Sequence, residues 1–175
     1  MSSRWLMSSA CRFAGAFFVV SIALLSSPGS AQRAGAVASS PFDGLPGNWS
    51  GSGTITLSNG SKERIRCRAE YGAPAGQGTL RMALRCASDS YKFDLRSNVT
   101  FAGGGISGQW TEATRNAAGN VTGSARGEHI EALVDSPGFS ARVLVTTRGD
   151  RQSVTINGRG QEAAQVAITL NRGSS

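Results

Sequence analysis

Apolar and polar residues alternate in short runs along this chain from Phe42 onwards. Turn-forming pairs such as Asn-Gly, Gly-Gly and Pro-Gly separate the runs, at the roughly 8–12-residue spacing of all-β folds. Alternation with a period of two is typical of a β-strand that buries one face. Inward-facing apolar positions are expected in the segments 49–57, 62–71, 80–86, 91–101, 106–110, 121–125, 130–134, 139–145, 154–156 and 166–170.

These segments predict an all-β fold in which about ten short strands form one antiparallel meander. Hardly any stretch shows the 3.6-residue period of an amphipathic helix. Because the loops are short, each strand should pair with its neighbour in sequence. A closed barrel is the arrangement that most readily leaves no open strand edge. We therefore expect residues 42–175 to form a single domain, an antiparallel barrel of about 8–10 strands.

The segments 62–71 and 80–86 alternate most regularly, and they predict a hairpin with a defined register. Pairing them around the loop GAPAGQG sets Tyr71 opposite Met82 and Cys67 opposite Cys86. Directly opposed Cβ atoms lie ~4.5–5.5 Å apart, which fits a cross-strand disulfide. Such a bond would close a loop of about 20 residues and stabilise the fold by ~3 kcal/mol. Two free thiols, or half of a metal site, are the alternatives.

The outward-facing positions of the same two segments form a basic face. It consists of Arg64, Arg66, Arg68, Arg81 and Arg85 in a chain with a formal net charge of +7. In a membrane-spanning barrel these arginines would lie in lipid at ~2–4 kcal/mol each near the midplane. We therefore expect a barrel that does not span a membrane.

The expected register also places Arg68 opposite Arg85, and like charges in that position are destabilising. The cluster therefore suggests an anionic partner, such as acidic lipid head groups or an anionic polymer of the cell envelope. A solvated face, neutralised locally by Glu63, Glu70 and Asp94, is the alternative. Nucleic acid is not an expected partner, because aromatic residues do not interleave with the arginines.

The N-terminal residues have the pattern of an export signal. Arg4 and Arg12 precede a short apolar run over 13–25, and small residues follow up to Ala31. The run is shorter than the ~20 residues of a membrane-spanning helix, which makes an uncleaved anchor the less favoured alternative. We therefore expect a signal peptide over 1–31, a flexible leader over 32–41, and a periplasmic or secreted protein. The remaining cysteine pair suits an oxidising compartment.

The start of the first expected strand carries a family resemblance. Gly47-Asn48-Trp49 resembles the G-x-W motif that opens lipocalin barrels, and GNWSGSG is similar to the opening strand of avidin-like barrels. The later lipocalin motifs and a biotin-site pattern are not evident. The resemblance implies a calycin-type barrel closed at one end by Trp49, with Arg172 stacked on the indole ring. It also implies a short turn of helix over 42–46.

A second resemblance is to small secreted inhibitors of bacterial metalloproteases. Those proteins are also β-barrels with one disulfide and a tryptophan in the first strand. They inhibit through an extended N-terminal trunk, a part that residues 32–41 could supply here. The resemblance implies protease inhibition as a further candidate function.

Catalytic chemistry is hard to find in the sequence. The one histidine, His129, has no companion for a tetrahedral metal site, and no G-x-S-x-G elbow is present. We expect His129 to be exposed, and we expect no enzymatic activity, metal or cofactor.

The barrel interior is the remaining candidate site. The residues expected there as ligand contacts are Trp49, Gly51, Tyr71, Met82, Tyr91, Phe93, Trp110 and Phe139. An apolar pocket with a few polar groups is the usual site for a small ligand. Aromatic side chains can also fill a barrel of ~8 strands, so a packed core is the alternative. The leading hypothesis is an exported, non-enzymatic barrel that binds a small apolar or amphipathic molecule or acts at the cell envelope.

Overall fold

The computed structural model describes residues 40–73, 78–159 and 163–173. The expected signal peptide and residues 32–39 of the expected leader lie outside this part and stay predictions. The described residues contain ten strands and no helix: β1 (Gly47–Leu57), β2 (Lys62–Gly72), β3 (Thr79–Ala87), β4 (Lys92–Ala102), β5 (Gly105–Glu112), β6 (Ala117–Arg126), β7 (His129–Ser136), β8 (Phe139–Arg148), β9 (Arg151–Arg159) and β10 (Ala163–Arg172).

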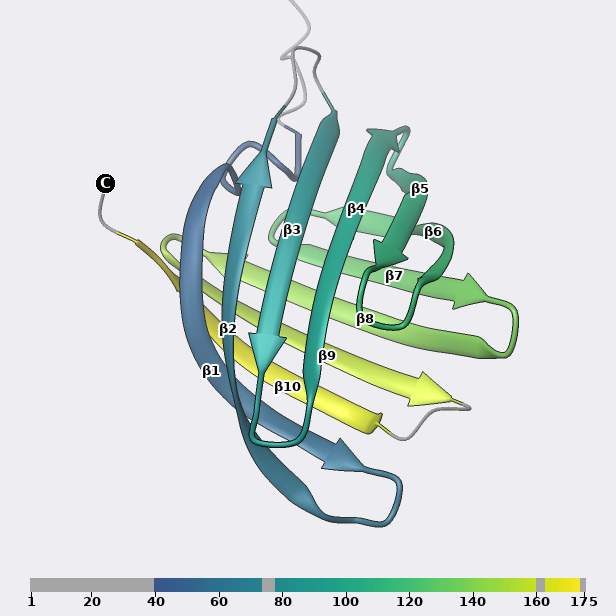
Figure 1. Ribbon diagram of the computed structural model, residues 1–175. Helices are drawn as coiled ribbons and strands as arrows, with labels where there is room; N and C mark the ends of the chain where they lie inside the picture. The colour runs from purple at the N-terminus through teal and green to yellow at the C-terminus, as the bar shows by residue number, and fades with distance from the viewer. Residues whose placement is uncertain (1–39, 74–77, 160–162, 174–175) are drawn as a thin grey trace, which may run out of the picture. The chain divides into compact units, whose positions relative to one another are not determined.

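The ten strands form a closed antiparallel barrel, which confirms the predicted fold class. Each strand pairs with its neighbour in sequence, and the pairing of β1 with β10 closes the barrel. In Figure 1, the strands β2 to β5 and most of β1 stand roughly upright on the page, whereas β6 to β10 lie across it. The two halves of the barrel therefore cross at a steep angle, and their inner faces enclose the core.

Strand β1 belongs to both halves and is strongly bent (Figure 1). Two glycines allow this bend, because their missing side chains let another backbone come close. A Cβ atom at Gly51 would lie 1.9 Å from the carbonyl oxygen of Thr169, and one at Gly53 would lie 1.9 Å from that of Ala167. These are impossible contacts, so the opening Gly-rich run serves strand coiling.

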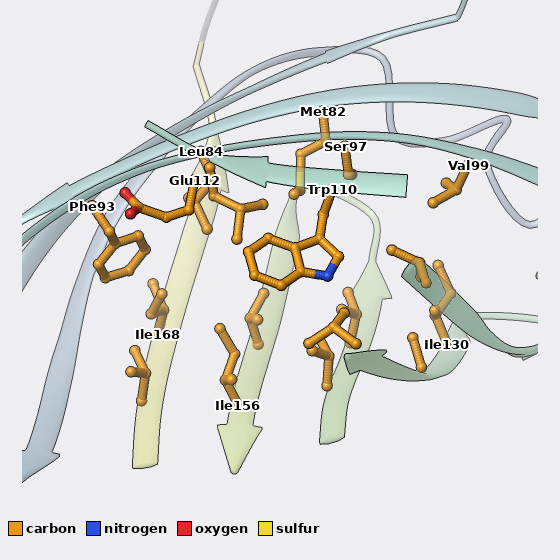
Figure 2. A pocket seen from close by; sticks show the side chains of 18 of the residues that line it. Met82, Leu84, Phe93, Ser97, Val99, Trp110, Glu112, Ile130, Ile156 and Ile168 are labelled. Carbon is orange, nitrogen blue, oxygen red and sulfur yellow. The ribbon is translucent and has the colours of Figure 1, made fainter. Parts of the chain in front are cut away.

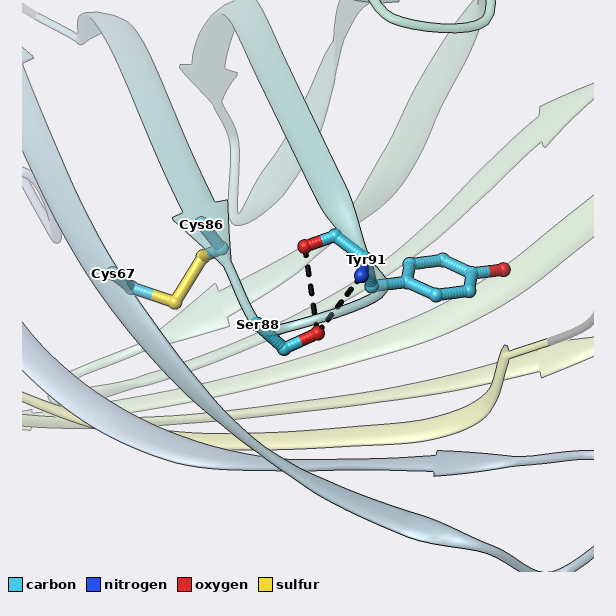
Figure 3. Close-up of a disulfide and its surroundings, with 4 residues drawn as sticks. All are labelled: Cys67, Cys86, Ser88 and Tyr91. Carbon is cyan, nitrogen blue, oxygen red and sulfur yellow. Dashed lines mark hydrogen bonds between the residues drawn. A yellow bond between two sulfur atoms is a disulfide. The ribbon is translucent and has the colours of Figure 1, made fainter.

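The β2–β3 hairpin has the predicted register. Tyr71 pairs with Met82 and Cys67 with Cys86. The two cysteines form a disulfide with a Cα–Cα distance of 4.1 Å, and Figure 3 shows it beside the β3–β4 turn. Free thiols and a half metal site are thereby excluded for this pair.

The two ends of the barrel differ, and the end where β1 begins is closed by the segment before it. Phe42 and Leu45 are buried there, and the ring of Phe42 meets Phe101 edge-on at 6.2 Å. A short helical turn was expected in this segment. The segment forms a turn held by two backbone hydrogen bonds, in which the amides of Asp43 and Leu45 each donate to the carbonyl oxygen three residues earlier. We call this segment, residues 40–46, the plug.

The predicted pair of Trp49 and Arg172 is confirmed at the same end. The guanidinium carbon of Arg172 lies 4.4 Å from the centre of the indole ring. Arg172 also donates hydrogen bonds to the carbonyl oxygens of Pro46, at 2.6 Å, and Gly44. Trp49 is 1% exposed, and its indole N–H donates to the carbonyl oxygen of Leu45. This arrangement ties the plug to both the first and the last strand.

Within the described part of the chain, no helix is long and apolar enough to cross a membrane.

Candidate functional site

A cavity of about 450 Å³ lies inside the barrel (Figure 2). Its walls are mostly aliphatic and aromatic side chains, among them Met82, Phe93, Trp110 and Ile156. The polar side chains among the described lining residues are those of Tyr71, Tyr91, Ser97, Glu112, Arg115, Ser136 and Gln152, besides the indole N–H of Trp110. The interior is therefore hollow, and the alternative of a fully packed core does not apply.

The cavity is closed at the plug and open at the opposite end. Lining residues near the plug, such as Phe42, Leu45 and Gln152, are buried. At the opposite end, Arg115 and Pro137 line the cavity and are exposed. We call this end the mouth; it is formed by the turns that join β3 to β4, β5 to β6 and β7 to β8.

A buried polar chain lies near the closed end. The Tyr71 hydroxyl donates to Gln152 Oε1 at 2.7 Å, and Gln152 Nε2 donates to Thr147 Oγ1 at 3.0 Å. Gln152 is 0% exposed. Burial raises the pKa of Tyr71 to about 12, against the smaller lowering effect of its hydrogen bond to Gln152. Tyr71 therefore stays a neutral donor at physiological pH.

A carboxylate lies at the mouth and is held in its charged form. Glu112 is buried and accepts hydrogen bonds from the amides of Asp94, at 2.9 Å, and Arg115, at 2.8 Å, and from the amide and hydroxyl of Thr114. Burial acts to raise the pKa of Glu112, but these hydrogen bonds together lower it below its ordinary value. Glu112 thus fixes the β5–β6 turn and does not offer a free carboxylate.

A cation–π pair stands beside Glu112 at the mouth. The guanidinium carbon of Arg115 lies 4.9 Å from the centre of the Tyr91 ring. Arg115 Nη1 also donates to the carbonyl oxygen of Lys92 at 3.3 Å. In the adjacent β3–β4 turn, the amide of Tyr91 donates a hydrogen bond to the hydroxyl of Ser88, as Figure 3 shows.

Trp110 stands in the middle of the cavity wall. It is 5% exposed, and the ring of Phe139 meets its indole edge-on at 5.8 Å. In Figure 2 the indole nitrogen lies on the ring edge turned away from Phe93 and Glu112. This buried nitrogen has no hydrogen-bond partner among the described residues.

The structure brings six of the eight expected interior residues together in the cavity wall: Tyr71, Met82, Tyr91, Phe93, Trp110 and Phe139. Trp49 and Gly51 are not in the wall. Trp49 packs against the plug, and the backbone of β10 comes close to Gly51, so neither faces the hollow space. Contact with a ligand stays a prediction for the six.

Sequence reasoning missed two interior polar residues, Gln152 and Glu112. A signal for them was present: Gln152 precedes Val154 by two positions, and Glu112 follows Trp110 by two. Strand periodicity alone therefore places both on the inner face.

The basic face lies on the outer side of β2 and β3, where Arg64, Arg66, Arg68, Arg81 and Arg85 are all exposed. Arg68 pairs with Arg85, as predicted. Asp94 binds Arg85 at 3.0 Å and lies 3.8 Å from Arg96. In the described part of the chain the other four arginines of the face form no ion pair. Glu63, an expected neutraliser, instead accepts hydrogen bonds from Ser88 and Ser90.

His129 is exposed at the start of β7, and its Nδ1 lies 3.0 Å from Thr146 Oγ1. Among the residues that the structure describes, no group of three or more His, Cys, Asp or Glu side chains is placed to hold a metal ion.

Fold and cavity together define a closed antiparallel barrel of ten strands, sealed at one end and hollow inside. The fold is similar to that of Rv2717c from M. tuberculosis, with a TM-score of 0.58, 15% identity, and coverage of 76% of this chain and 95% of that one. It is also similar to the S-type phycobiliprotein lyase CPES from Guillardia theta, with a TM-score of 0.52, 11% identity, and coverage of 77% and 91%. At these identities the likeness concerns the fold alone. No family model and no curated protein matches the sequence.

The likeness to lipocalin and avidin barrels is coarse. Lipocalins have eight strands, whereas this barrel has ten. The shared features are the closed antiparallel meander, the tryptophan near the start of the first strand and the arginine on its ring.

Proposed function

We propose that this protein is exported and binds a small, mainly apolar ligand in the barrel cavity. The main observation behind this proposal is the apolar cavity of about 450 Å³, which has a mouth at one end. Ligand pockets usually measure ~300–1,000 Å³ and combine apolar walls with a few polar groups. An engineered apolar cavity of ~150 Å³ already binds benzene.

The volume sets the size of the ligand. If one non-hydrogen atom takes the ~30 Å³ that a water takes in the liquid, about 450 Å³ holds roughly 15 such atoms. That is the size of a medium-length aliphatic chain or of two to three fused rings. Burial of such a molecule gains ~25 cal/mol for each Å² of apolar surface removed from water.

Two further observations support the proposal. The disulfide between Cys67 and Cys86 suits an oxidising compartment outside the cytosol, as does the signal-like pattern over 1–31. The fold is also shared by a protein described as a phycobiliprotein lyase. That description belongs to the other protein; for this chain we propose binding without catalysis.

Native mass spectrometry of the protein purified from its source gives the direct test. A bound molecule that dissociates as a mass of the expected size supports the proposal. In a second test, the neutral fluorescent probe N-phenyl-1-naphthylamine is titrated into the wild type and two variants. Ser97→Phe fills the cavity, because Ser97 lines it, whereas Ser107→Phe adds the same ring on the exposed face of β5. Loss of probe binding in S97F but not in S107F is expected; equal binding by all three proteins contradicts the proposal.

A second candidate function is docking of the basic face on an anionic surface of the cell envelope. The observation that favours it is the pair of Arg68 and Arg85, both exposed and directly opposed, in which Asp94 neutralises Arg85 while Arg68 has no ion pair among the described residues. Retention on vesicles containing anionic lipid should fall as salt shortens the Debye length from ~30 Å at 0.01 M to ~10 Å at 0.1 M. R68Q/R85Q should weaken retention more than the matched R151Q/R159Q on β9. Equal effects would assign retention to net charge. Protease inhibition depends on residues 32–41, of which 32–39 lie outside the described part, and stays a sequence prediction.

A further inference from the structure

Arg115 is the only cation among the described residues that line the cavity. It lies in the turn between β5 and β6, and its side chain is 41% exposed. Solvent therefore reaches the guanidinium group, although the walls behind it are mostly apolar. A molecule that enters the cavity past this turn meets a positive charge at the mouth and apolar side chains inside.

Both the backbone and the side chain of Arg115 are held in place. The amides of Thr114 and Arg115 donate to the carboxylate of Glu112, at 3.1 and 2.8 Å. The guanidinium carbon lies 4.9 Å from the centre of the Tyr91 ring. Nη1 donates to the carbonyl oxygen of Lys92 at 3.3 Å and to Thr114 Oγ1 at 3.2 Å. A group that is already ordered loses little entropy when it binds a ligand.

The hydrogen bonds of the Arg115 side chain use one nitrogen and leave two. In the described part of the chain, Nη1 donates to protein acceptors, whereas Nε and Nη2 donate to none. The N–H groups of Nε and Nη2 lie on one edge of the planar guanidinium group, and their spacing matches the two oxygens of a carboxylate. The edge of Arg115 that suits a carboxylate is therefore unused by the protein.

Glu112 is the nearest negative charge and bears on whether a second carboxylate fits. Its Oε2 lies 3.8 Å from Nη1 of Arg115, and no hydrogen bond joins the two side chains. The charge of Glu112 is stabilised by the amides of Asp94, Thr114 and Arg115 and by the Thr114 hydroxyl. Because these groups compensate Glu112, the edge formed by Nε and Nη2 of Arg115 is left for another anion.

We propose that Arg115 binds the carboxylate of an amphipathic ligand whose apolar tail fills the barrel cavity. The inference rests on the proposed function and narrows its ligand class to monocarboxylic acids with a medium-length apolar tail. The tail enters first and the head group stays at the solvent-exposed mouth, so that the charge is not buried. Decanoic acid, with roughly 12 non-hydrogen atoms, is within the roughly 15 that the cavity holds.

The test compares decanoate with decanamide, in which an NH₂ group replaces one oxygen and removes the charge at nearly the same shape. Isothermal titration calorimetry measures both affinities in the wild type, Arg115→Gln and the control Lys92→Gln. Lys92 is exposed beside the same turn and does not line the cavity. R115Q should weaken decanoate binding by ~3–10-fold and decanamide binding by less than ~2-fold, whereas K92Q should change either by less than ~2-fold.

A second readout uses the wild-type protein labelled with ¹⁵N at arginine. Decanoate should move the Nε–H resonance of Arg115 downfield, because a charged acceptor forms the stronger hydrogen bond, and decanamide should move it much less. The conservative variant R115K identifies this resonance by its loss. It keeps the charge without the planar pair of donors, so its affinity for decanoate should lie between those of the wild type and R115Q.

Several outcomes would overturn the inference and leave the proposed function standing. They are equal losses for decanoate and decanamide in R115Q, equal losses of decanoate binding in R115Q and K92Q, and binding of N-phenyl-1-naphthylamine without binding of decanoate. If the wild type binds none of the three molecules, the proposed function falls, and this inference falls with it. The NMR titration is made on the wild type, so the inference remains testable if R115Q does not fold.

Discussion

At the scale of single residues, the barrel interior separates two kinds of polar group. Tyr71 and Gln152 satisfy each other near the closed end, whereas the buried N–H of Trp110 has no hydrogen-bond partner among the described residues. The first arrangement contributes to stability, since both groups are buried and bonded. The second costs stability, because a buried donor without an acceptor has lost its hydrogen bonds to water.

The pair of Tyr71 and Gln152 gives the first prediction. Tyr71→Phe leaves Gln152 Oε1 buried without its donor and should destabilise the protein by ~1–3 kcal/mol in urea denaturation with the disulfide intact. The double variant Y71F/Q152M replaces both partners with apolar groups and should recover part of this loss. If the double variant loses as much stability as Y71F and Q152M lose together, the two side chains are not energetically coupled, and the hydrogen bond does not stabilise the fold.

The raised pKa of Tyr71 gives a second prediction, on the alkaline side. The folded protein holds the tyrosine proton up to about pH 12, whereas the unfolded chain releases it near its ordinary value of 10.0. Stability from this group is complete below pH 10 and is lost as the pH rises towards 12, because the unfolded state then binds fewer protons. Each unit of difference in pKa between the folded and unfolded states corresponds to ~1.4 kcal/mol. The free energy of unfolding should therefore fall by roughly 2–3 kcal/mol over this pH range.

Near-ultraviolet titration of tyrosinate checks this prediction. The protein has two tyrosines, Tyr71 and Tyr91. In Y71F, the ionisation step near pH 12 should disappear, and stability should fall less steeply between pH 10 and 12 than in the wild type. Identical alkaline stability curves for the two proteins would contradict the assignment.

At the scale of elements, β1 is the strand on which barrel closure depends. It pairs with β2 on one side and β10 on the other, and it bends between the two halves of the barrel. The bend is possible because the β10 backbone occupies the space that side chains at Gly51 and Gly53 would need.

Alanine substitution in strands tests this role of glycine. Gly51→Ala should destabilise the protein by ~1–3 kcal/mol or more, because the added methyl meets a backbone oxygen that cannot move aside. Gly72→Ala is the matched control, since a Cβ on this β2 glycine meets nothing within 4 Å. Thermal or urea unfolding measures both variants. Similar stabilities would show that β1 can relax around the clash.

Much of the architecture at this scale could be predicted from the sequence. Regular alternation predicted about ten strands, and two cysteines expected on the same face of one hairpin predicted both its register and the disulfide. The G-x-W resemblance gave the contact between Arg172 and Trp49. These features depend on local periodicity or on a short motif, so a single sequence is enough to read them.

The cavity was beyond such reasoning. Alternation says which side chains point inward, but whether they fill the space depends on how the two crossing halves of the barrel pack. The resemblance implied a turn over 42–46, but the burial of this segment was not foreseen, because Phe42 and Leu45 precede the first strand and follow no strand period. Trp49 was therefore expected in a ligand site, although the plug seals it from the cavity.

At the scale of the whole molecule, the barrel has a closed end and a mouth. The plug, Trp49 and Arg172 seal one end, and exposed lining residues mark the other. A ligand is therefore expected to enter and leave past the turns at the mouth, between the β5–β6 turn and the β7–β8 turn.

Because only one end of the barrel is open, a bulky group at the mouth should affect the kinetics of ligand binding. Ala117→Trp places a large ring on a half-buried residue that lines the cavity at the mouth, and it should slow both association and dissociation of N-phenyl-1-naphthylamine by ~10-fold or more. Ala113→Trp, on the exposed β5–β6 turn outside the lining, is the control. Stopped-flow fluorescence measures both rates. Unchanged rates in A117W would place the entry route elsewhere.

The seam between β1 and β10 has a consequence for how the chain is made. Nine of the ten strand pairings join strands adjacent in sequence, whereas Trp49 pairs with Arg172 across nearly the whole barrel. Synthesis delivers Trp49 first and Arg172 last, so one edge of β1 stays unpaired until the final strand arrives. An unpaired edge is a template for aggregation, but glycine within a strand weakens pairing with another chain. We therefore expect the glycines that bend β1 in the finished barrel also to weaken pairing of this edge with other chains before β10 arrives.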